Sequence, residues 1–294
     1  KFLCPAPGYD RHFNICEYFD IEMIPIEMTP DGPNMATAAE LVESDPRIKG
    51  MWCVPKFSNP QGITYSDETV RRIAALSPKS KDFRIFWDNA YSVHELTEEN
   101  IKLLSIMDEC KKRNNEQLPI IFCSLSKVTF AGAAISALAC RGENFSALKR
   151  RYLVQSVGPN KLNQLRHVRF LKNLSGIKSH MKRHQKILYP KFNIVLSILK
   201  KHFATNPIVQ WETPQGGYFI SVYLMEGCAK RTVELCKNAG VSLTAAGATY
   251  PYGFDPLDSN IRIAPSFPSR ENLSQAMEIF SISVKIAYLE NILK

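Results

Sequence analysis

The stretch FRIFWDNAY at residues 83–91 places a short apolar run directly before a group of polar side chains. Aromatic and β-branched residues favour strands, so we expect a buried strand over Phe83–Trp87. Asp88 and Tyr91 then follow the carboxyl end of that strand. An acid and a phenol in this position are candidates for a binding site at the edge of a sheet.

Two more predicted strands end in polar motifs. Ser58-Asn59-Pro60-Gln61-Gly62 follows a strand at Met51–Val54, and Ser124-Leu125-Ser126-Lys127 follows one at Pro119–Cys123. Ligands of open α/β sheets bind outside the carboxyl ends of the strands, so residues after successive strands converge there. Each motif alone is common in turns, helix caps or surfaces. Their order, with Arg262 following in an Asn-Ile-Arg-Ile strand, predicts one shared site.

The surrounding chain predicts an α/β protein with a mostly parallel sheet, flanking helices and a smaller α+β domain at the carboxyl end. A long helical pattern from Gly176 to about His202 is interrupted by Pro190, which should kink the helix or mark the change from one domain to the next, and we place a large domain at 1–190 and a small one at 191–294. A further helix is expected after Ser66. The other expected elements are strands at Phe2–Cys4, Ile21–Ile26, Ile135–Cys140, Ile208–Trp211, Tyr218–Tyr223, Val241–Leu243 and Asn260–Ala264, and helices near Ala229–Asn238 and Arg270–Leu293.

Composition excludes several classes of protein. The 294 residues are 45% hydrophobic and 22% charged, and no apolar run approaches the roughly 20 residues that span a bilayer, so we expect no membrane partner. The net charge of +9 is local, because residues 146–202 hold fourteen Lys or Arg and no Asp or Glu. Aromatic residues are not interleaved with these charges, so an exposed helix face is expected, or an anion-binding face at a subunit boundary, rather than a nucleic-acid site.

The cysteines and histidines predict neither disulfides nor a metal site. No two of the eight cysteines have Cys-x-x-Cys spacing, and most lie in apolar stretches, so we expect free thiols and a cytoplasmic protein. The histidines, His94 among them, are scattered without ligand spacing, so we expect no metal.

Taken together, the motifs resemble those of the fold-type I pyridoxal-phosphate aminotransferases, most closely the subgroup Ic aspartate aminotransferases. The resemblance runs from end to end and implies the fold of that class. It rests on Pro5-Ala6-Pro7-Gly8-Tyr9-Asp10-Arg11-His12, Asn59-Pro60-Gln61-Gly62, Asp88-Asn89-Ala90-Tyr91, the Ser-x-Ser-Lys-x-Thr-Phe-Ala-Gly motif around Lys127, the segment from Gly158 to His167, Gly216-Gly217-Tyr218-Phe219 and the segment from Ile261 to Pro268.

The resemblance implies that pyridoxal 5'-phosphate is the cofactor and that Lys127 carries it as a Schiff base. A buried lysine amine can act as a nucleophile near neutral pH and then move the α-proton of the substrate. The electron sink of the cofactor requires a protonated pyridine nitrogen, which a carboxylate stabilises. Asp88 takes that role by resemblance, with His12 behind it as an orienting partner.

The remaining site residues are also assigned by resemblance. Asn59 and Tyr91 would bond the phenolic oxygen of the cofactor ring, and Tyr9 would stack on its face. Ser124 and Ser126 would bind the phosphate. Arg262 would hold the substrate α-carboxylate with its forked guanidinium. Tyr218 and Phe219 are expected to be core residues rather than substrate contacts.

Two positions depart from the family pattern. Gln61 stands where Thr is familiar, a change whose side chain need not touch the ring. Ile135 stands where many members carry a phosphate-binding arginine, so another cation must neutralise the phosphate. Lys161 or Arg166, reaching in from a second subunit, is our hypothesis.

The function implied is transfer of an amino group from aspartate to 2-oxoglutarate by a ping-pong cycle, in a homodimer with active sites at the interface. Another amino donor, a β-lyase or a decarboxylase remains open on the same scaffold. A transcription regulator that uses such a domain as a cofactor sensor is the alternative from a different class. A catalytically dead homologue would have lost motif residues, whereas Asn59, Asp88, Tyr91, Lys127 and Arg262 are intact.

We expect these 294 residues to be a fragment, because they begin at Lys1 within a strand-like segment and the family's N-terminal arm and phosphate loop are not visible. The chain alone should therefore bind pyridoxal phosphate weakly or not at all. An absorbance titration of the isolated chain measures this directly, and a tight internal Schiff base would contradict the expectation.

Overall fold

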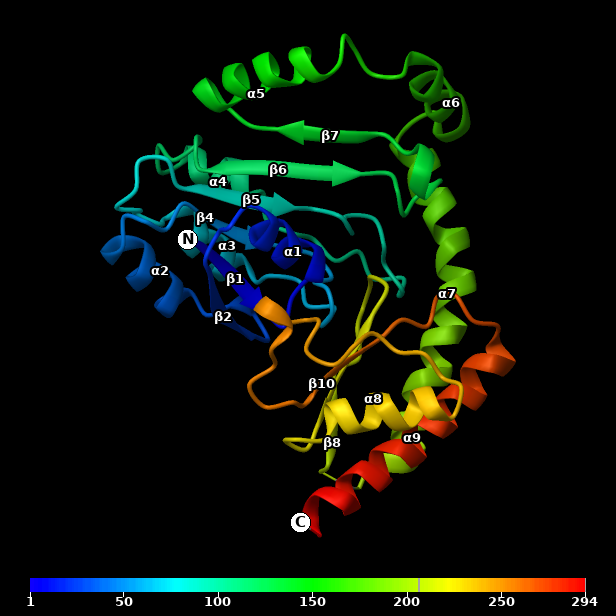
Figure 1. Cartoon of the computed structure of the whole chain (residues 1–294). Helices are drawn as coiled ribbons and strands as arrows, with labels where there is room; N and C mark the ends of the chain where they lie inside the picture. The colour runs from blue at the N-terminus through cyan, green and yellow to red at the C-terminus, as the bar shows by residue number, and fades with distance from the viewer. Residues whose placement is uncertain (206, 294) are drawn as a thin grey trace.

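The computed structural model describes residues 1–205 and 207–293, and its larger layer is a seven-stranded sheet of order β3-β2-β1-β4-β5-β6-β7 (Figure 1). Strand pairs from β2 to β6 are parallel, and the edge strands β3 and β7 are antiparallel to their neighbours. This confirms the expected α/β class with a mostly parallel sheet. The strands are β1 (Phe2–Ala6), β2 (Met23–Thr29), β3 (Gly32–Pro33), β4 (Gly50–Cys53), β5 (Arg84–Asp88), β6 (Pro119–Ser124) and β7 (Ser136–Ala139).

The strand predicted at Ile135–Cys140 exists, but its direction departs from the parallel pattern expected of the first half of the chain. β7 runs antiparallel to β6, with Ser124 opposite Ser136. A parallel neighbour would need a crossover long enough for a helix. The connection here holds only one 3₁₀ turn, η1 (Ala131–Ala133), so the chain must turn straight back.

Helices follow the strands, and most of them bury one face. α3 begins where expected: Ser66 Oγ accepts a hydrogen bond from the amide of Thr69 at 3.2 Å, and Val70 and Ile73 are fully buried against the sheet. Side chains from β1, β4 and β5 complete this core. The helices are α1 (Asp10–Tyr18), α2 (Met35–Ser44), α3 (Asp67–Ala74), α4 (Ile106–Lys111), α5 (Gly142–Gln155), α6 (Lys161–Leu171), α7 (Leu174–Phe203), α8 (Ala229–Asn238) and α9 (Arg270–Ile292).

A second sheet of order β10-β9-β8 forms the smaller layer with α8, α9 and the end of α7 (Figure 1). It is antiparallel, with strands β8 (Val209–Trp211), β9 (Ile220–Leu224) and β10 (Asn260–Ile263), and a 3₁₀ turn η2 (Pro251–Gly253) precedes β10. The strand predicted at Val241–Leu243 is wrong. The Val241 amide donates to the carbonyl of Cys236 at 2.8 Å, so it belongs to the end of α8 and is not available to a sheet.

Pro190 lies inside the long helix and does not end it. α7 runs over 30 residues with Pro190 inside it, and it spans from the large sheet to the small one (Figure 1). Proline removes one backbone hydrogen bond. Burial of Met181 before it and of Phe192 and Val195 after it holds both halves in place. The domain boundary at 190 stays a prediction. Within the described residues, none of the helices is long and apolar enough to cross a membrane.

Gly216 is required by packing, and this generates a test. An added Cβ at Gly216 would meet the ring of Phe57 at 2.4 Å, and Phe57 is 1% exposed. We expect Gly216→Ala to lower the free energy of unfolding by about 1–3 kcal/mol. Urea denaturation measures the change. Gly158→Ala is the matched control, because nothing lies within 4 Å of its added Cβ. Equal stability of the two variants would contradict the packing argument.

Candidate active site

The end of β5 and the start of α1 are joined by a hydrogen bond between Asp88 and His12. Asp88 Oδ2 lies 3.0 Å from His12 Nε2. The imidazole is buried, and it stacks on the indole of Trp52 with ring centroids 4.1 Å apart and planes within 8°. Tyr9, the residue before α1, makes an edge contact with the imidazole, with ring centroids 5.1 Å apart. The first turn of α1 therefore brings Tyr9 and His12 to the Asp88 carboxylate.

Lys127 lies over Tyr91 and near Asp88. Its Nζ is 5.0 Å from the centre of the Tyr91 ring. Burial lowers the pKa of Lys127, and the charge of Asp88 opposes that fall. Burial also raises the pKa of Tyr91, and the charges of Asp88 and Arg262 both act on this phenol. A lysine with a lowered pKa and a buried neutral phenol thus lie within the electrostatic influence of the carboxylate that ends β5.

Arg262 on β10 connects the second sheet to the Asn59 loop. Its Nη1 donates to Asn59 Oδ1 at 3.2 Å and to Asp10 Oδ1 at 2.9 Å. Among the residues that the structure describes, neither Asn59 Nδ2 nor Arg262 Nε has a hydrogen-bond partner, although both atoms are buried. Buried donors are normally satisfied. These two atoms are therefore donors suited to a bound molecule.

Ser124 and Ser126 form a hydroxyl cluster at the end of β6. Their Oγ atoms are 2.7 Å apart, and the Oγ of Ser136 lies 3.2 Å from that of Ser124. Ser124 and Asp88 both line a groove of about 840 Å³ between the sheet and α5. Of the two cations proposed for the phosphate, Arg166 donates to the carbonyl of Ala133 and to Asn163 Oδ1, and Lys161 is exposed. Their role remains a hypothesis.

Most of the site residues predicted from the sequence thus lie in one connected group, and Ser124 lines a groove together with Asp88. Asp10, Arg262 and Asn59 are linked by hydrogen bonds, α1 carries the link to His12 and Asp88, and Lys127 and Tyr91 lie beside Asp88. The sequence argument placed these residues together from three strand ends. It did not foresee that α1 joins the two sheets.

Several side chains in the site were missed. The Tyr218 hydroxyl donates to the Lys127 carbonyl at 3.1 Å, and the Phe219 ring lies 4.9 Å from the Arg262 guanidinium carbon. The expectation that both are core residues is therefore incomplete, because they pack on Val54, Phe57 and Tyr91 and also contact the site. Asp10 stood inside a quoted motif without a role. Its ion pair with Arg262, 252 positions away, leaves no signal in local sequence.

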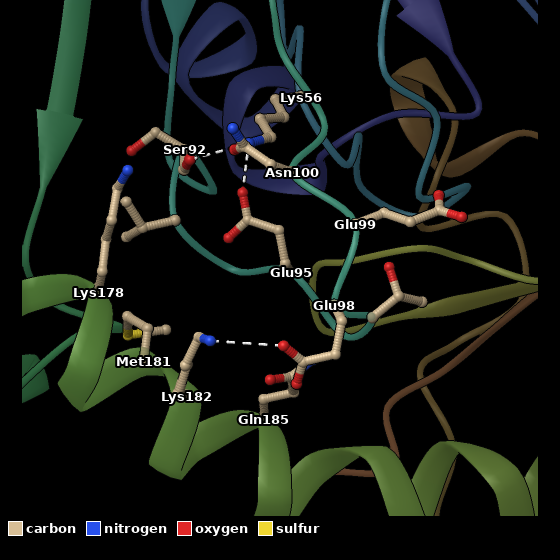
Figure 2. A pocket seen from close by; sticks show the side chains of 12 residues that line it. Lys56, Ser92, Glu95, Glu98, Glu99, Asn100, Lys178, Met181, Lys182 and Gln185 are labelled. Atoms are coloured by element: carbon tan, nitrogen blue, oxygen red, sulfur yellow. Dashed lines mark hydrogen bonds and ion pairs between the residues drawn. The ribbon is translucent and has the colours of Figure 1, made fainter.

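A separate pocket of about 470 Å³ lies between residues 92–100 and α7 (Figure 2). The buried Lys56 donates to Glu95 Oε1 at 2.7 Å and to the Ser92 carbonyl at 3.0 Å. Lys182 and Glu98, which also line the pocket, form an ion pair of 3.4 Å. Acidic and basic side chains balance in this pocket, so its charge favours neither an anion nor a cation.

His94 is buried between the rings of Tyr91 and Tyr218, and burial lowers its pKa to about 4. It is therefore a neutral ring at physiological pH. Over residues 1–205 and 207–293, no group of three or more His, Cys, Asp or Glu side chains could hold a metal ion.

Comparison with known proteins identifies the family. The model of the aspartate aminotransferase family matches residues 1–294. The aspartate aminotransferase of Corynebacterium glutamicum is 43% identical over 291 residues, which are 99% of this chain and 67% of that protein. The crystal structure of an aspartate transaminase from the same species superposes with a TM-score of 0.96, at 43% identity, over 99% of this chain and 68% of that one.

A more distant structure shares the fold alone. The LysN α-aminoadipate aminotransferase of Thermus thermophilus, solved with N-(5'-phosphopyridoxyl)-L-leucine, is 18% identical with a TM-score of 0.82, over 98% of this chain and 72% of that one. The chain thus spans about two thirds of the length of its relatives. The match over its full length shows that this chain belongs to the aspartate aminotransferase family of fold-type I enzymes.

Proposed function

We propose that this aminotransferase uses pyridoxal 5'-phosphate to move an amino group from aspartate to 2-oxoglutarate, with Lys127 as the catalytic residue. The observation that carries the proposal is the connected group of Lys127, Asp88 with His12, and Arg262 with Asn59. Aspartate is proposed as the donor because the Corynebacterium relative that bears that name is 43% identical over nearly the whole chain.

The residues present fit this cofactor. Asp88 is backed by His12 and retains 23% side-chain exposure, so its carboxylate can face a pyridinium nitrogen. The unpartnered Nδ2 of Asn59 and the hydroxyl of Tyr91 can donate to the phenolic oxygen of the ring. The hydroxyl cluster of Ser124 and Ser126 offers donors to the phosphate, and Tyr9 can stack on the ring.

When bound, the cofactor supplies an electron sink for the charge that develops at the substrate α-carbon. Lys127 would attach the cofactor and carry the proton of that carbon on its Nζ, because its lowered pKa keeps more of the amine neutral. Arg262 would orient the substrate through its α-carboxylate. Phe219 packs on the guanidinium and Tyr218 bonds the Lys127 carbonyl, so both support these groups from behind.

We also propose a homodimer with active sites at the subunit interface. Apolar side chains are exposed on α5, which lines the groove that holds Asp88 and Ser124, and on α6: Val154 is 89% exposed and Leu162 is 81% exposed. Exposed apolar patches of this kind favour association. A cytoplasmic location is proposed because the eight cysteines are free thiols.

The reaction is tested with full-length protein, pyridoxal phosphate and 2-oxoglutarate against single amino donors. We expect glutamate to form fastest from aspartate. Lys127→Ala should lower kcat at least about 10⁴-fold, because both the attachment and the proton carrier are lost. Lys237→Ala, on the exposed side of α8, is the matched control and should keep its activity. Turnover surviving in Lys127→Ala would overturn the assigned chemistry.

The pKa of Lys127 yields a second test in full-length protein without cofactor. The neutral amine is acylated, so labelling of Lys127 by acetic anhydride should rise with pH through its lowered pKa. Asp88 favours the ammonium, so Asp88→Asn should move the midpoint to lower pH. Mass spectrometry of the labelled peptide reports the midpoint.

Asp67→Asn is the control for this shift, because it removes an exposed carboxylate from α3. It should leave the Lys127 midpoint in place. A midpoint that stays unchanged or rises in Asp88→Asn would show that the two groups do not interact.

A further inference from the structure

The partner of Arg262 within this chain is a carboxylate at the start of α1. Asp10 is the first residue of that helix, and its Oδ1 lies 2.9 Å from Arg262 Nη1. The Arg262 side chain is 10% exposed and that of Asp10 is 33% exposed. A buried guanidinium without a counter-ion is strongly unfavourable. Asp10 supplies the counter-ion.

Both hydrogen bonds that Arg262 makes within the described residues come from one nitrogen of its guanidinium. Nη1 donates to Asp10 and to Asn59, while the buried Nε has no partner in the part of the chain that the structure describes. An arginine binds a carboxylate in a fork of two parallel N–H groups. Because the resident partners hold Nη1, the side that carries Nε is directed to an incoming carboxylate.

The charge of Asp10 acts against that incoming carboxylate. A carboxylate ligand that binds Arg262 meets a guanidinium already paired with Asp10. The ligand is therefore repelled by the neighbouring Asp10 carboxylate. From this geometry we propose that Asp10 is a positioning residue that orients Arg262 and reduces its affinity for substrate carboxylates. This inference rests on the proposed role of Arg262 and assigns a role to a residue outside that proposal.

This arrangement has a use in turnover. The same carboxylate site must bind an amino acid and release an oxo acid in each half of the reaction. An uncompensated buried arginine would hold both tightly, and tight binding shared by substrate and product does not raise kcat. With Asp10 beside it, Arg262 keeps its orientation in the free enzyme and releases the product more readily.

Asp10→Asn separates charge from geometry. The amide oxygen can still accept from Nη1, so the guanidinium keeps a partner while the negative charge is removed. We expect the Kd of succinate for the full-length holoenzyme, measured by isothermal titration calorimetry, to fall about three- to tenfold. The KM for the amino donor should fall in the same direction. Asp10→Glu, which restores the charge, should return the Kd to within about twofold of the parent.

Glu17→Gln is the matched control, since it removes one carboxylate from the exposed side of the same helix. It should leave the succinate Kd unchanged. A purely structural role for Asp10 would lower the melting temperature of Asp10→Asn without tightening succinate. That result, or weaker binding, would overturn the proposal. Should Asp10→Asn not fold, Asp10→Ser also removes the charge while keeping an acceptor, and the same sign is expected.

Arg262→Lys distinguishes the two proposals. If Arg262→Lys loses succinate binding and Asp10→Asn does not lower the succinate Kd, only the proposed role of Asp10 is contradicted. Unchanged succinate binding in Arg262→Lys would show that Arg262 is not the carboxylate site, and the proposed function would then lose its substrate clamp.

Discussion

The hydrogen bond between His12 and Asp88 fixes the geometry on which the whole site depends. Asp88 ends a strand of the large sheet, and His12 belongs to the first turns of α1. The same turn carries Asp10, which reaches β10 of the small sheet through Arg262. A partly buried carboxylate needs such a partner. The hydrogen bond from His12 to this carboxylate fixes α1 between the two sheets. The polar groups of both sheets are thereby held at one place.

Much of this arrangement could be predicted from the sequence, because parallel sheets impose simple rules. Apolar runs followed by polar motifs located β4, β5 and β6, and the rule that ligands bind at strand ends placed Asn59, Asp88 and Lys127 together. Local patterns failed where distant contacts decide the outcome. Val241 has a strand-like neighbourhood, but its amide bonds the carbonyl of Cys236 at the end of α8. Asp10 and Phe219 show the same limit, since their partner Arg262 is fixed by tertiary structure.

The basic segment at 146–202 shows that residue composition alone does not describe a protein surface. Its fourteen basic residues predicted an exposed helix face, and α5 has no buried residue. Large apolar side chains such as Val154 and Leu162 are exposed among those charges, however, and the edge strand β7 is exposed at all four positions. A face that mixes cations with apolar groups is better suited to contact with another polypeptide than to solvent alone.

The stack of Trp52 on His12 places a tryptophan one residue away from the carboxylate on which the site depends. The indole lies parallel to the imidazole at 4.1 Å and donates from Nε1 to Cys16 Sγ at 3.4 Å, and only two other tryptophans, Trp87 and Trp211, share the chain. Because His12 bonds Asp88 directly, a movement of that carboxylate that displaces the imidazole also changes the surroundings of the indole.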